Sequence, residues 1–348
     1  MKQEPQRVLL VGKFSLDPTV YTYPSSFIDA FKAAGYEVHP FNLLPRYRFL
    51  PGWIENKLLN YRLLKTIKTI APQLIFIIKG NSIFPATLKK IKAAFPQTSV
   101  LHFYPDNPFC FWNGNSNASV LHSLPYLDAF LIWSKELVPI IEAAGCKHAL
   151  YFPFAVDEKI YHPRISLSAA EEKSFESDVV FVGTWDKERE YFLQQVVTAL
   201  PTLKLAIWGN RWATSLPAAS PLHAYFRGNA IYKEELLKAF AASKIVLNFI
   251  RPQNLQAHNM RTFEALAAGS FLLTQKTLEQ TQPPFVPDYN ITCFADSEDL
   301  IKKIAFYVNQ DSLRKEIALR GYELIRGFTI GAQVRSLLDT QPLKGSRP

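Results

Sequence analysis

An arginine and a glutamate three positions apart, Arg261 and Glu264, stand at the start of a short predicted helix in the segment HNMRTFEALAAGSFLLT (258–274). At this spacing the two side chains share one helix face, beside backbone N–H groups that have no partner within the helix. Such free donors and the helix dipole attract phosphate. A guanidinium for a diphosphate and a carboxylate for ribose hydroxyls would make a nucleotide-sugar site. The alternative is an exposed Arg–Glu pair, worth roughly a few tenths of a kcal/mol.

Further polar candidates follow the predicted strands, because ligands of an open parallel sheet bind beyond the carboxyl ends of its strands. In the first half of the chain, the candidates for an acceptor or cleft site are Lys79, Asn81, Asp106 and Asn107. In the second half, the candidates for a donor site are Gly183, Thr184, Trp185, Gly209, Asn210, His258 and Asn259. Glycines after strands let a ligand approach the backbone closely. A packing role for the tryptophan and a capping or surface role for the histidine stay open.

Asp106 is the candidate catalytic residue of the first half, together with Glu264 in the second. Asp106 is held between Pro105 and Pro108, just past a buried strand. A carboxylate fixed there could act as a general base or orient an acceptor hydroxyl. Equally, it could close an Asx turn in the sequence PDNP.

Strand-like and helix-like patterns alternate along the chain, which predicts parallel sheets with right-handed crossovers. In the first half we expect strands at 7–11, 37–39, 74–78, 100–104 and 129–133, and helices at 25–34, 57–70, 85–94 and 137–144. In the second half we expect strands at 178–182, 204–208, 245–250 and 271–274, and helices at 188–200, 233–242 and after residue 258, with two closing helices at 299–309 and 312–326.

The polar stretch 157–177 interrupts this alternation, has no sustained apolar period and is typical of a linker. We therefore expect an N-terminal Rossmann-like domain at 1–156 and a C-terminal Rossmann-like domain at 178–326. For the tail at 327–348, packing back on the N-terminal domain is one option.

The composition fits two globular domains: the chain has 348 residues, of which 48% are hydrophobic and 20% charged. Three widely spaced cysteines give neither a disulfide framework nor a zinc-ligand spacing. No apolar run approaches the length of a membrane span or of a signal sequence, so we expect a cytoplasmic protein.

A formal net charge of +9 indicates an anionic partner. The basic residues are scattered, and no aromatic–basic recognition motif is present, so nucleic acid is the weakest candidate and we expect none to bind. One local concentration of basic residues comprises Arg46, Arg48, Lys57, Arg62, Lys65 and Lys68. Aromatic and aliphatic side chains interleave with it, so it could contact an anionic membrane at the inner face or a polyanionic acceptor. It could also be the solvated face of an ordinary helix.

Two common phosphate-binding fingerprints are missing from the sequence. It contains neither GxGxxG nor GxxxxGK[ST]. A standard dinucleotide site and a P-loop are therefore not expected.

Taken together, the motifs LIFIIKG, YPDNPF, LPYLDAFLIWS, VVFVGTW and HNMRTFEALAAGSFLLT resemble those of the CgeB-like (spore maturation protein) glycosyltransferases, in the family's order and over nearly the whole chain. The resemblance implies an α/β fold of the GT-B type, with two Rossmann-like doubly wound parallel sheets facing a central cleft and a relation to the family-4 retaining enzymes. It also implies a nucleotide-diphosphate sugar bound mainly by the C-terminal domain, which makes 178–326 the donor domain, and an acceptor bound mainly by the N-terminal domain, which makes 1–156 the acceptor domain. No metal and no cofactor besides this co-substrate would be required.

Position by position, the resemblance assigns Glu264 to the second glutamate of the family-4 Glu-x7-Glu motif, the one that accepts from ribose hydroxyls. The first glutamate falls at Gln256, and an amide cannot stabilise a cationic centre by charge. Arg261 matches the arginine of the family's R-x-F-E element, near the diphosphate. Gly183 and Thr184 match the glycine-rich start of the donor domain. The phosphate-clamping Arg and Lys of family 4 have no clean match; Lys187 and Arg189 are the nearest basic residues.

We therefore expect a glycosyltransferase that moves a sugar, UDP-linked by default, to a hydroxyl of a glycan, glycolipid or surface-polymer precursor, with retention favoured over inversion. Two alternatives stay open. One is a nucleotide-sugar epimerase of the same fold, and the other is a non-catalytic module that binds a nucleotide or an anionic polymer.

Overall fold

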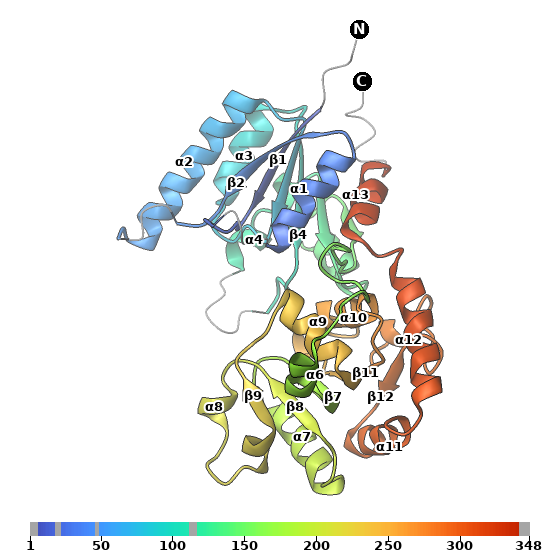
Figure 1. Ribbon diagram of the computed structural model, residues 1–348. Coiled ribbons are helices and arrows are strands. Elements are labelled where there is room, and N and C mark those ends of the chain that lie inside the picture. Colours follow the sequence, from blue (N-terminus) through green and yellow to red (C-terminus); the bar gives the residue numbers. More distant parts are fainter. Residues whose placement is uncertain (1–5, 18–21, 46–48, 111–116, 341–348) are drawn as a thin grey trace. The chain divides into compact units, whose positions relative to one another are not determined.

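A computed structural model describes residues 6–17, 22–45, 49–110 and 117–340 of the chain (Figure 1). Arg46 and Arg48 of the basic concentration lie outside these residues, as does the end of the tail after residue 340. The chain divides into two units. Unit 1 comprises residues 1–154, 253–255 and 330–348, and unit 2 comprises residues 155–252 and 256–329. As domain limits, the boundaries expected from the sequence stay a prediction.

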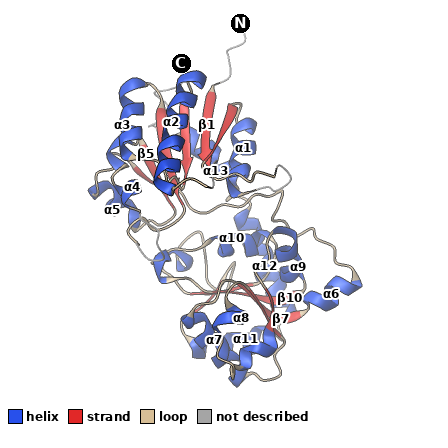
Figure 2. Ribbon diagram, turned by 90° about the vertical axis from the view of Figure 1, so that its left-hand side faces the viewer, coloured by secondary structure: helices blue, strands red, loops and turns tan. Residues whose placement is uncertain are grey.

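Unit 1 is built on a parallel sheet of six strands in the order β2-β1-β3-β4-β5-β6. The strands are β1 (Arg7–Gly12), β2 (Glu37–Asn42), β3 (Leu74–Ile78), β4 (Ser99–Tyr104), β5 (Ala129–Ile132) and β6 (Ala149–Tyr151). The helices are α1 (Tyr23–Ala33), α2 (Gly52–Ile70), α3 (Pro85–Ala94), α4 (Ala118–Leu121), α5 (Leu137–Ala143) and α13 (Ile330–Leu338). Helices on both faces bury the sheet, so β3 reads LIFII and is buried along its whole length (Figure 2).

Unit 2 has a second parallel six-stranded sheet, in the order β12-β11-β10-β7-β8-β9. Its strands are β7 (Ser177–Val182), β8 (Leu205–Trp208), β9 (Phe226–Gly228), β10 (Ser243–Asn248), β11 (Leu272–Gln275) and β12 (Thr292–Phe294). Its helices are α6 (Ala169–Phe175), α7 (Lys187–Ala199), α8 (Trp212–Ser215), α9 (Lys233–Ala241), α10 (Met260–Ala267), α11 (Ser297–Tyr307) and α12 (Asp311–Ile325). Counted within the unit, this strand order is 6-5-4-1-2-3, the Rossmann order, and it reverses between β7 and β10.

The α/β class and the two Rossmann-like parallel sheets expected from the sequence are confirmed. The structure differs from the expectation in several elements, and the short helices α4 and α8 were also not expected. The strands β6, β9 and β12 were not expected, because three residues at a sheet edge are too few to show a period. The stretch expected to be a linker contains α6, which begins with a capping box between Ser168 and Glu171. The helix expected at 57–70 begins five residues earlier, at Gly52. A further helix, α13, follows the two that were expected to close the chain, and it packs against α1 within unit 1.

Among the described helices, none is long and apolar enough to cross a membrane.

Candidate functional site

In an open parallel sheet a ligand is expected beyond the carboxyl ends of the strands where the strand order reverses, which in unit 2 is at β7 and β10. We call this place the crevice. Three arginines gather at this point. Arg189 lies in the first turn of α7, Arg251 follows β10, and Arg261 lies in the first turn of α10. Burial is the main cause that lowers the pKa of Arg189 to about 10, and the positive charges of the other two arginines lower it further. Arg251 and Arg261 are therefore both close enough to Arg189 for their charges to act on its guanidinium.

Three contacts hold Arg261 in place. Its Nη1 donates to Glu264 Oε2 at 2.6 Å, and its Nη2 donates to the carbonyl oxygen of Val182, the last residue of β7, at 3.3 Å. The guanidinium carbon lies 5.3 Å from the ring centroid of Phe240. Among the described residues its buried Nε has no hydrogen-bond partner. A preorganised cation with a spare donor suits an oxyanion.

Glu264 is buried, with 8% of its surface exposed, and both of its carboxylate oxygens are occupied. Oε2 accepts from Arg261, and Oε1 accepts from the hydroxyl of Tyr161 at 2.8 Å. The pair expected from the sequence is therefore real, and it is not the exposed surface pair of the alternative interpretation. Tyr161 was missed, because it lies about a hundred residues away in the stretch interpreted as a linker.

Arg189 and Arg251 share a carboxylate. Asp186 Oδ2 lies 3.2 Å from Arg189 Nε and 3.4 Å from Arg251 Nε. Arg189 also donates to the carbonyl oxygen of Thr184 at 2.7 Å, so it braces the loop after β7 from within. Arg251 is the more accessible of the two, with 31% of its side chain exposed. An anionic ligand can therefore compete with Asp186 for Arg251 more readily than for Arg189.

Gly183 and Gly209 bring the turns after β7 and β8 into direct contact. Gly183 N donates to the carbonyl oxygen of Trp208 at 2.8 Å. A Cβ on Gly209 would lie 1.9 Å from the carbonyl oxygen of Gly183, and Gly209 has a φ of +156°. Only glycine fits at such a close backbone approach. Asn210 continues this turn, and its carbonyl oxygen accepts from Trp185 N at 2.9 Å.

Trp185 is already engaged within unit 2. Its indole Nε1 donates to Glu190 Oε2 at 2.7 Å, and the guanidinium of Arg211 lies 5.4 Å from its ring centroid. In this arrangement the ring is part of the wall of the site. A base or sugar could stack on it only where Arg211 leaves the ring open.

Asn259 and His258 lie directly before α10. Asn259 caps the helix, and its Oδ1 accepts from Thr262 N at 3.3 Å. The ring of His258 is buried with 1% exposure, and its centroid lies 4.6 Å from that of Phe263. The imidazole is thus a packing residue beneath the helix N-terminus in this structure, whereas the cap leaves other N–H groups of the first turn for a ligand.

Gln256, at the position of the expected first glutamate, anchors a loop. Its side-chain oxygen accepts from Leu278 N at 3.2 Å, and its backbone oxygen accepts from Glu279 N at 2.9 Å. An amide oxygen serves this purpose without a charge.

The candidates of unit 1 also form a connected group at the ends of β3 and β4. Lys79 Nζ lies 2.7 Å from Asp106 Oδ2. Asn107, and not Asp106, closes the turn, because Asn107 Oδ1 accepts from Phe109 N at 2.9 Å. Asn81 donates to the Tyr104 hydroxyl at 2.9 Å. Burial is the main cause that raises the pKa of this hydroxyl to about 12, so it stays protonated.

Neither group is a metal site by composition. Within the part of the chain that is described, no cluster of three or more His, Cys, Asp or Glu side chains could hold a metal ion.

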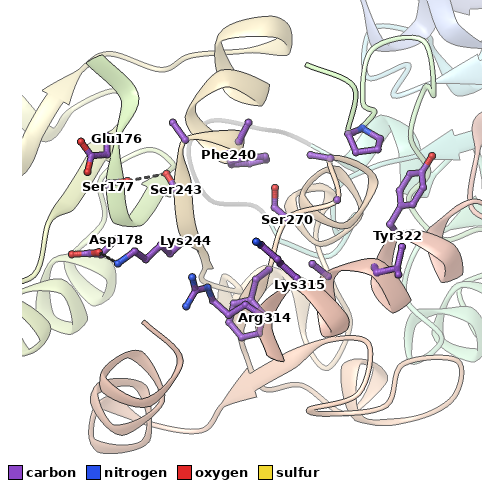
Figure 3. A pocket seen from close by; sticks show the side chains of 18 of the residues that line it. Glu176, Ser177, Asp178, Phe240, Ser243, Lys244, Ser270, Arg314, Lys315 and Tyr322 are labelled. Carbon is purple, nitrogen blue, oxygen red and sulfur yellow. Dashed lines mark hydrogen bonds and ion pairs between the residues drawn. The ribbon is translucent and has the colours of Figure 1, made fainter. Parts of the chain in front are cut away.

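A cavity of about 640 Å³ lies elsewhere in unit 2 (Figure 3). Ser177, Ser243 and Ser270, at or just before the amino ends of strands, line it together with Lys315 and Tyr322 of α12. A parallel sheet binds its ligands at the opposite edge, so this volume is not the expected nucleotide site.

Comparison with known proteins gives a family match over part of the chain and a fold shared with solved structures. Residues 188–339 match the protein family described as glycosyl transferase-like. The fold is that of the GT-B glycosyltransferases. Sucrose-phosphate synthase from Thermosynechococcus elongatus has a TM-score of 0.67 at 14% identity, over 95% of this chain and 98% of that one. Alr3699/HepE of Anabaena, solved with UDP-glucose, has a TM-score of 0.61 at 12% identity, over 96% and 98%.

The same fold also occurs in another enzyme class. A putative UDP-N-acetylglucosamine 2-epimerase from Listeria monocytogenes has a TM-score of 0.62 at 11% identity, over 99% of this chain and 98% of that one. No curated protein sequence matches the chain. At these identities the structural similarities establish the fold alone, so the function has to be argued from the residues of the candidate site.

Proposed function

We propose that the protein transfers a sugar from a nucleotide-diphosphate donor, with UDP favoured, to a hydroxyl of a glycan, glycolipid or surface-polymer precursor. The observation that carries the proposal is the group of three arginines at the Rossmann switch point of unit 2, next to the N-terminus of α10. The family match over residues 188–339, which cover most of this unit, supports transfer of a sugar as the reaction.

In this proposal Arg251, Arg261 and the free N–H groups of α10 bind the diphosphate. Its negative charge grows as the bond to the sugar breaks, so fixed positive groups stabilise the transition state more than the ground state. These groups supply the charge that a metal ion supplies in other transferases. Gly183 and Thr184 line the approach of the diphosphate, and Glu264 accepts from a ribose hydroxyl.

Asp106 has one of two roles in the proposal, depending on the stereochemistry. If the reaction inverts, Asp106 accepts the proton of the acceptor hydroxyl, and the ion pair with Lys79 holds the carboxylate in place. If the reaction retains, which we favour, Asp106 orients the acceptor. The anomeric configuration of the first product, followed by NMR, distinguishes the two.

Isothermal titration with UDP and with GDP tests donor binding. The wild type should bind at least one of them, and Arg261→Ala should weaken that binding at least tenfold, because a charged hydrogen bond contributes about 1.5–3 kcal/mol. Lys244→Ala is the matched control: it removes a cation of unit 2 that pairs with Asp178, away from the crevice. Undetectable binding of both nucleotides by the wild type would overturn the proposal.

The epimerase alternative shares the fold and the donor, so binding does not separate it from transfer. Incubation with a UDP-sugar in the absence of any acceptor does. Conversion of the sugar under these conditions would favour the epimerase, whereas conversion that depends on an added glycan or glycolipid supports transfer.

We also propose that unit 1 contacts an anionic membrane from the cytoplasmic side, which would bring a lipid-linked acceptor to the enzyme. Aromatic and lysine side chains recur every three or four residues on the exposed face of α2. They are Trp53, Lys57, Tyr61, Lys65 and Lys68, and all of them are exposed. Trp53 is 62% and Tyr61 67% exposed, and the ammonium of Lys57 lies 4.9 Å from the Trp53 ring centroid. The acidic residue of this helix, Glu55, is buried. Aromatic rings at the headgroup level and lysines against acidic lipids are typical of an interfacial helix.

Sedimentation with vesicles tests this contact. We expect the protein to bind vesicles that contain phosphatidylglycerol and not vesicles of phosphatidylcholine alone, with a blue shift of tryptophan emission. Trp53→Ala with Lys57→Ala should abolish binding, while the same exchanges at Tyr232, which is exposed, and Lys233, which is half-buried, both in unit 2, should not. Equal binding of both double variants would contradict the assignment to α2.

A further inference from the structure

Tyr161 makes the contact in the crevice that the sequence did not predict. Its hydroxyl donates to Glu264 Oε1. The other carboxylate oxygen, Oε2, accepts from Arg261. Burial and the neighbouring carboxylate raise the pKa of Tyr161 well above its usual value, with burial the larger cause. The phenol therefore stays protonated and can only donate to this carboxylate.

The segment that carries Tyr161 is fixed to unit 2 on both sides of the tyrosine. Before it, Val156 N donates to the carbonyl oxygen of Phe328 at 3.1 Å, and Asp157 O accepts from Tyr161 N at 2.9 Å. After it, Pro163 packs against the end of α10, where a Cβ on Gly269 would lie 2.9 Å from Pro163 Cβ. The chain thus runs along α10 and sets the phenol on Glu264.

A phenol on a carboxylate has the chemistry of a sugar hydroxyl on the same carboxylate. Each is a neutral O–H donor to a buried charged acceptor. Glu264 is 8% exposed, and Arg261 occupies its other oxygen, so one further donor fits where Tyr161 now lies.

We propose that the Tyr161 hydroxyl occupies the ribose subsite of the free enzyme and that a ribose hydroxyl of the donor displaces it from Glu264. The inference rests on the proposed function, because it takes Glu264 as the acceptor for the ribose. Tyr161 is thus a positioning residue. It keeps the buried carboxylate satisfied and aimed while the site is empty, and it leaves when the donor arrives.

This exchange sets how strongly the site recognises ribose. A ribose hydroxyl in the wild type replaces one hydrogen bond to Glu264 with another, so its net contribution is small. In Tyr161→Phe the carboxylate oxygen has no donor until the ligand supplies one, so the same hydroxyl contributes a full charge-assisted bond. Removing the phenol should therefore tighten nucleotide binding and sharpen the discrimination against nucleotides that lack a ribose hydroxyl.

The test compares the dissociation constants of UDP, 2′-deoxy-UDP and 3′-deoxy-UDP, or of the guanosine series if GDP is the nucleotide that binds. We expect Tyr161→Phe to bind the intact nucleotide roughly tenfold more tightly than the wild type does. For at least one of the two deoxy analogues, the affinity should be lower than that of the intact nucleotide by about threefold or less in the wild type and by at least tenfold in Tyr161→Phe.

Tyr307→Phe is the matched control, since it removes another tyrosine hydroxyl that donates to a carboxylate of unit 2, Asp288, at 3.1 Å. It should lower the melting temperature as Tyr161→Phe does and leave nucleotide binding unchanged. If the wild type binds neither nucleotide, the proposed function fails and this inference fails with it. If the wild type binds and Tyr161→Phe binds equally or more weakly, with the same response to the deoxy analogues, the inference alone is overturned.

Discussion

Substitution of Arg251 tests the proposed contact with phosphate with the least disturbance of the fold. Its guanidinium is partly exposed, and its ion pair with Asp186 at 3.4 Å is shared with Arg189, so Asp186 keeps a partner when Arg251 is removed. We expect Arg251→Ala to weaken binding of the nucleotide about tenfold or more, by loss of a charged hydrogen bond to phosphate, with little change in the melting temperature. Titration calorimetry and a thermal melt measure both. Unchanged affinity would remove Arg251 from the proposed diphosphate site.

His102 gives the residue-scale prediction of how stability responds to pH. It is buried in β4, where Nε2 donates to the carbonyl oxygen of Lys79 at 3.0 Å, and burial lowers its pKa to about 4. The unfolded chain takes up this proton below about pH 6.5, whereas the folded protein takes it up only near pH 4. Between these values the unfolded state binds more protons, so acidification destabilises the fold.

Urea denaturation at pH 7 and pH 4.5 should show this directly. His102 should contribute about 2 kcal/mol to the fall in the free energy of unfolding of the wild type. In His102→Gln, whose amide can still donate to Lys79, the fall should be smaller by that amount. An identical fall in wild type and variant would show that His102 is not the group that titrates.

The sequence predicted some residues of the site and not others, for physical reasons. Arg261 and Glu264 could be predicted because they are three residues apart in the chain, and Gly183 because it directly follows an expected strand. Tyr161 and the shared role of Asp186 were not, because the partners of a hydrogen bond between distant segments leave no local pattern. Arg251 directly follows the strand expected at 245–250, and this place was the only indication of a role for it. Its neighbours Ile250 and Pro252 did not indicate that its charge contacts a ligand or a carboxylate.

At the scale of elements, the turns after β7 and β8 decide whether the crevice has its shape. The methyl group of Gly209→Ala would overlap the carbonyl group of Gly183. Neither backbone segment can move away without breaking the pairing of β7 with β8 that ends there. We expect a loss of about 3 kcal/mol or more in the free energy of unfolding, together with weaker nucleotide binding. Gly52→Ala, at the exposed start of α2 with no atom within 4 Å of the new Cβ, should be neutral or slightly stabilising. Urea titration of both variants is the measurement, and equal stability of the two would contradict the close approach.

The elements themselves were predictable where burial is two-sided. The expected strand at 74–78 and the expected helix at 85–94 coincide with β3 and α3, because a continuous apolar run and a proline-initiated amphipathic stretch are strong local signals. The short edge strands were missed. So was α13, although Ile330, Val334, Leu337 and Leu338 have helical spacing and are all buried. Its partner α1 lies at the other end of the chain, so the sequence showed an apolar face without showing what covers it.

At the scale of the whole molecule, the chain builds unit 1, then unit 2, and then returns to unit 1 with α13. The returning helix buries four apolar side chains, and the side-chain nitrogen of Gln333 donates to the carbonyl oxygen of Pro153 at 2.5 Å, at the point where the chain leaves unit 1. Each buried apolar side chain of this size contributes about 1.5–3 kcal/mol. Unit 1 is therefore incomplete as the continuous segment 1–154, and its stability depends on residues that follow unit 2 in the chain.

Deletion of residues 330–348 should consequently destabilise one unit and spare the other. We expect backbone amides of α1, whose apolar side chains lose their cover, to exchange hydrogen much faster in the deletion variant. Amides of α7 and β7, in unit 2, should keep their wild-type protection. Deletion of residues 341–348 alone retains α13 and should leave both units unchanged. Hydrogen exchange followed by mass spectrometry resolves the two units peptide by peptide. Uniform loss of protection in the longer deletion would show that the two units unfold as one cooperative body, whereas unchanged protection of α1 would mean that α13 adds no stability to unit 1.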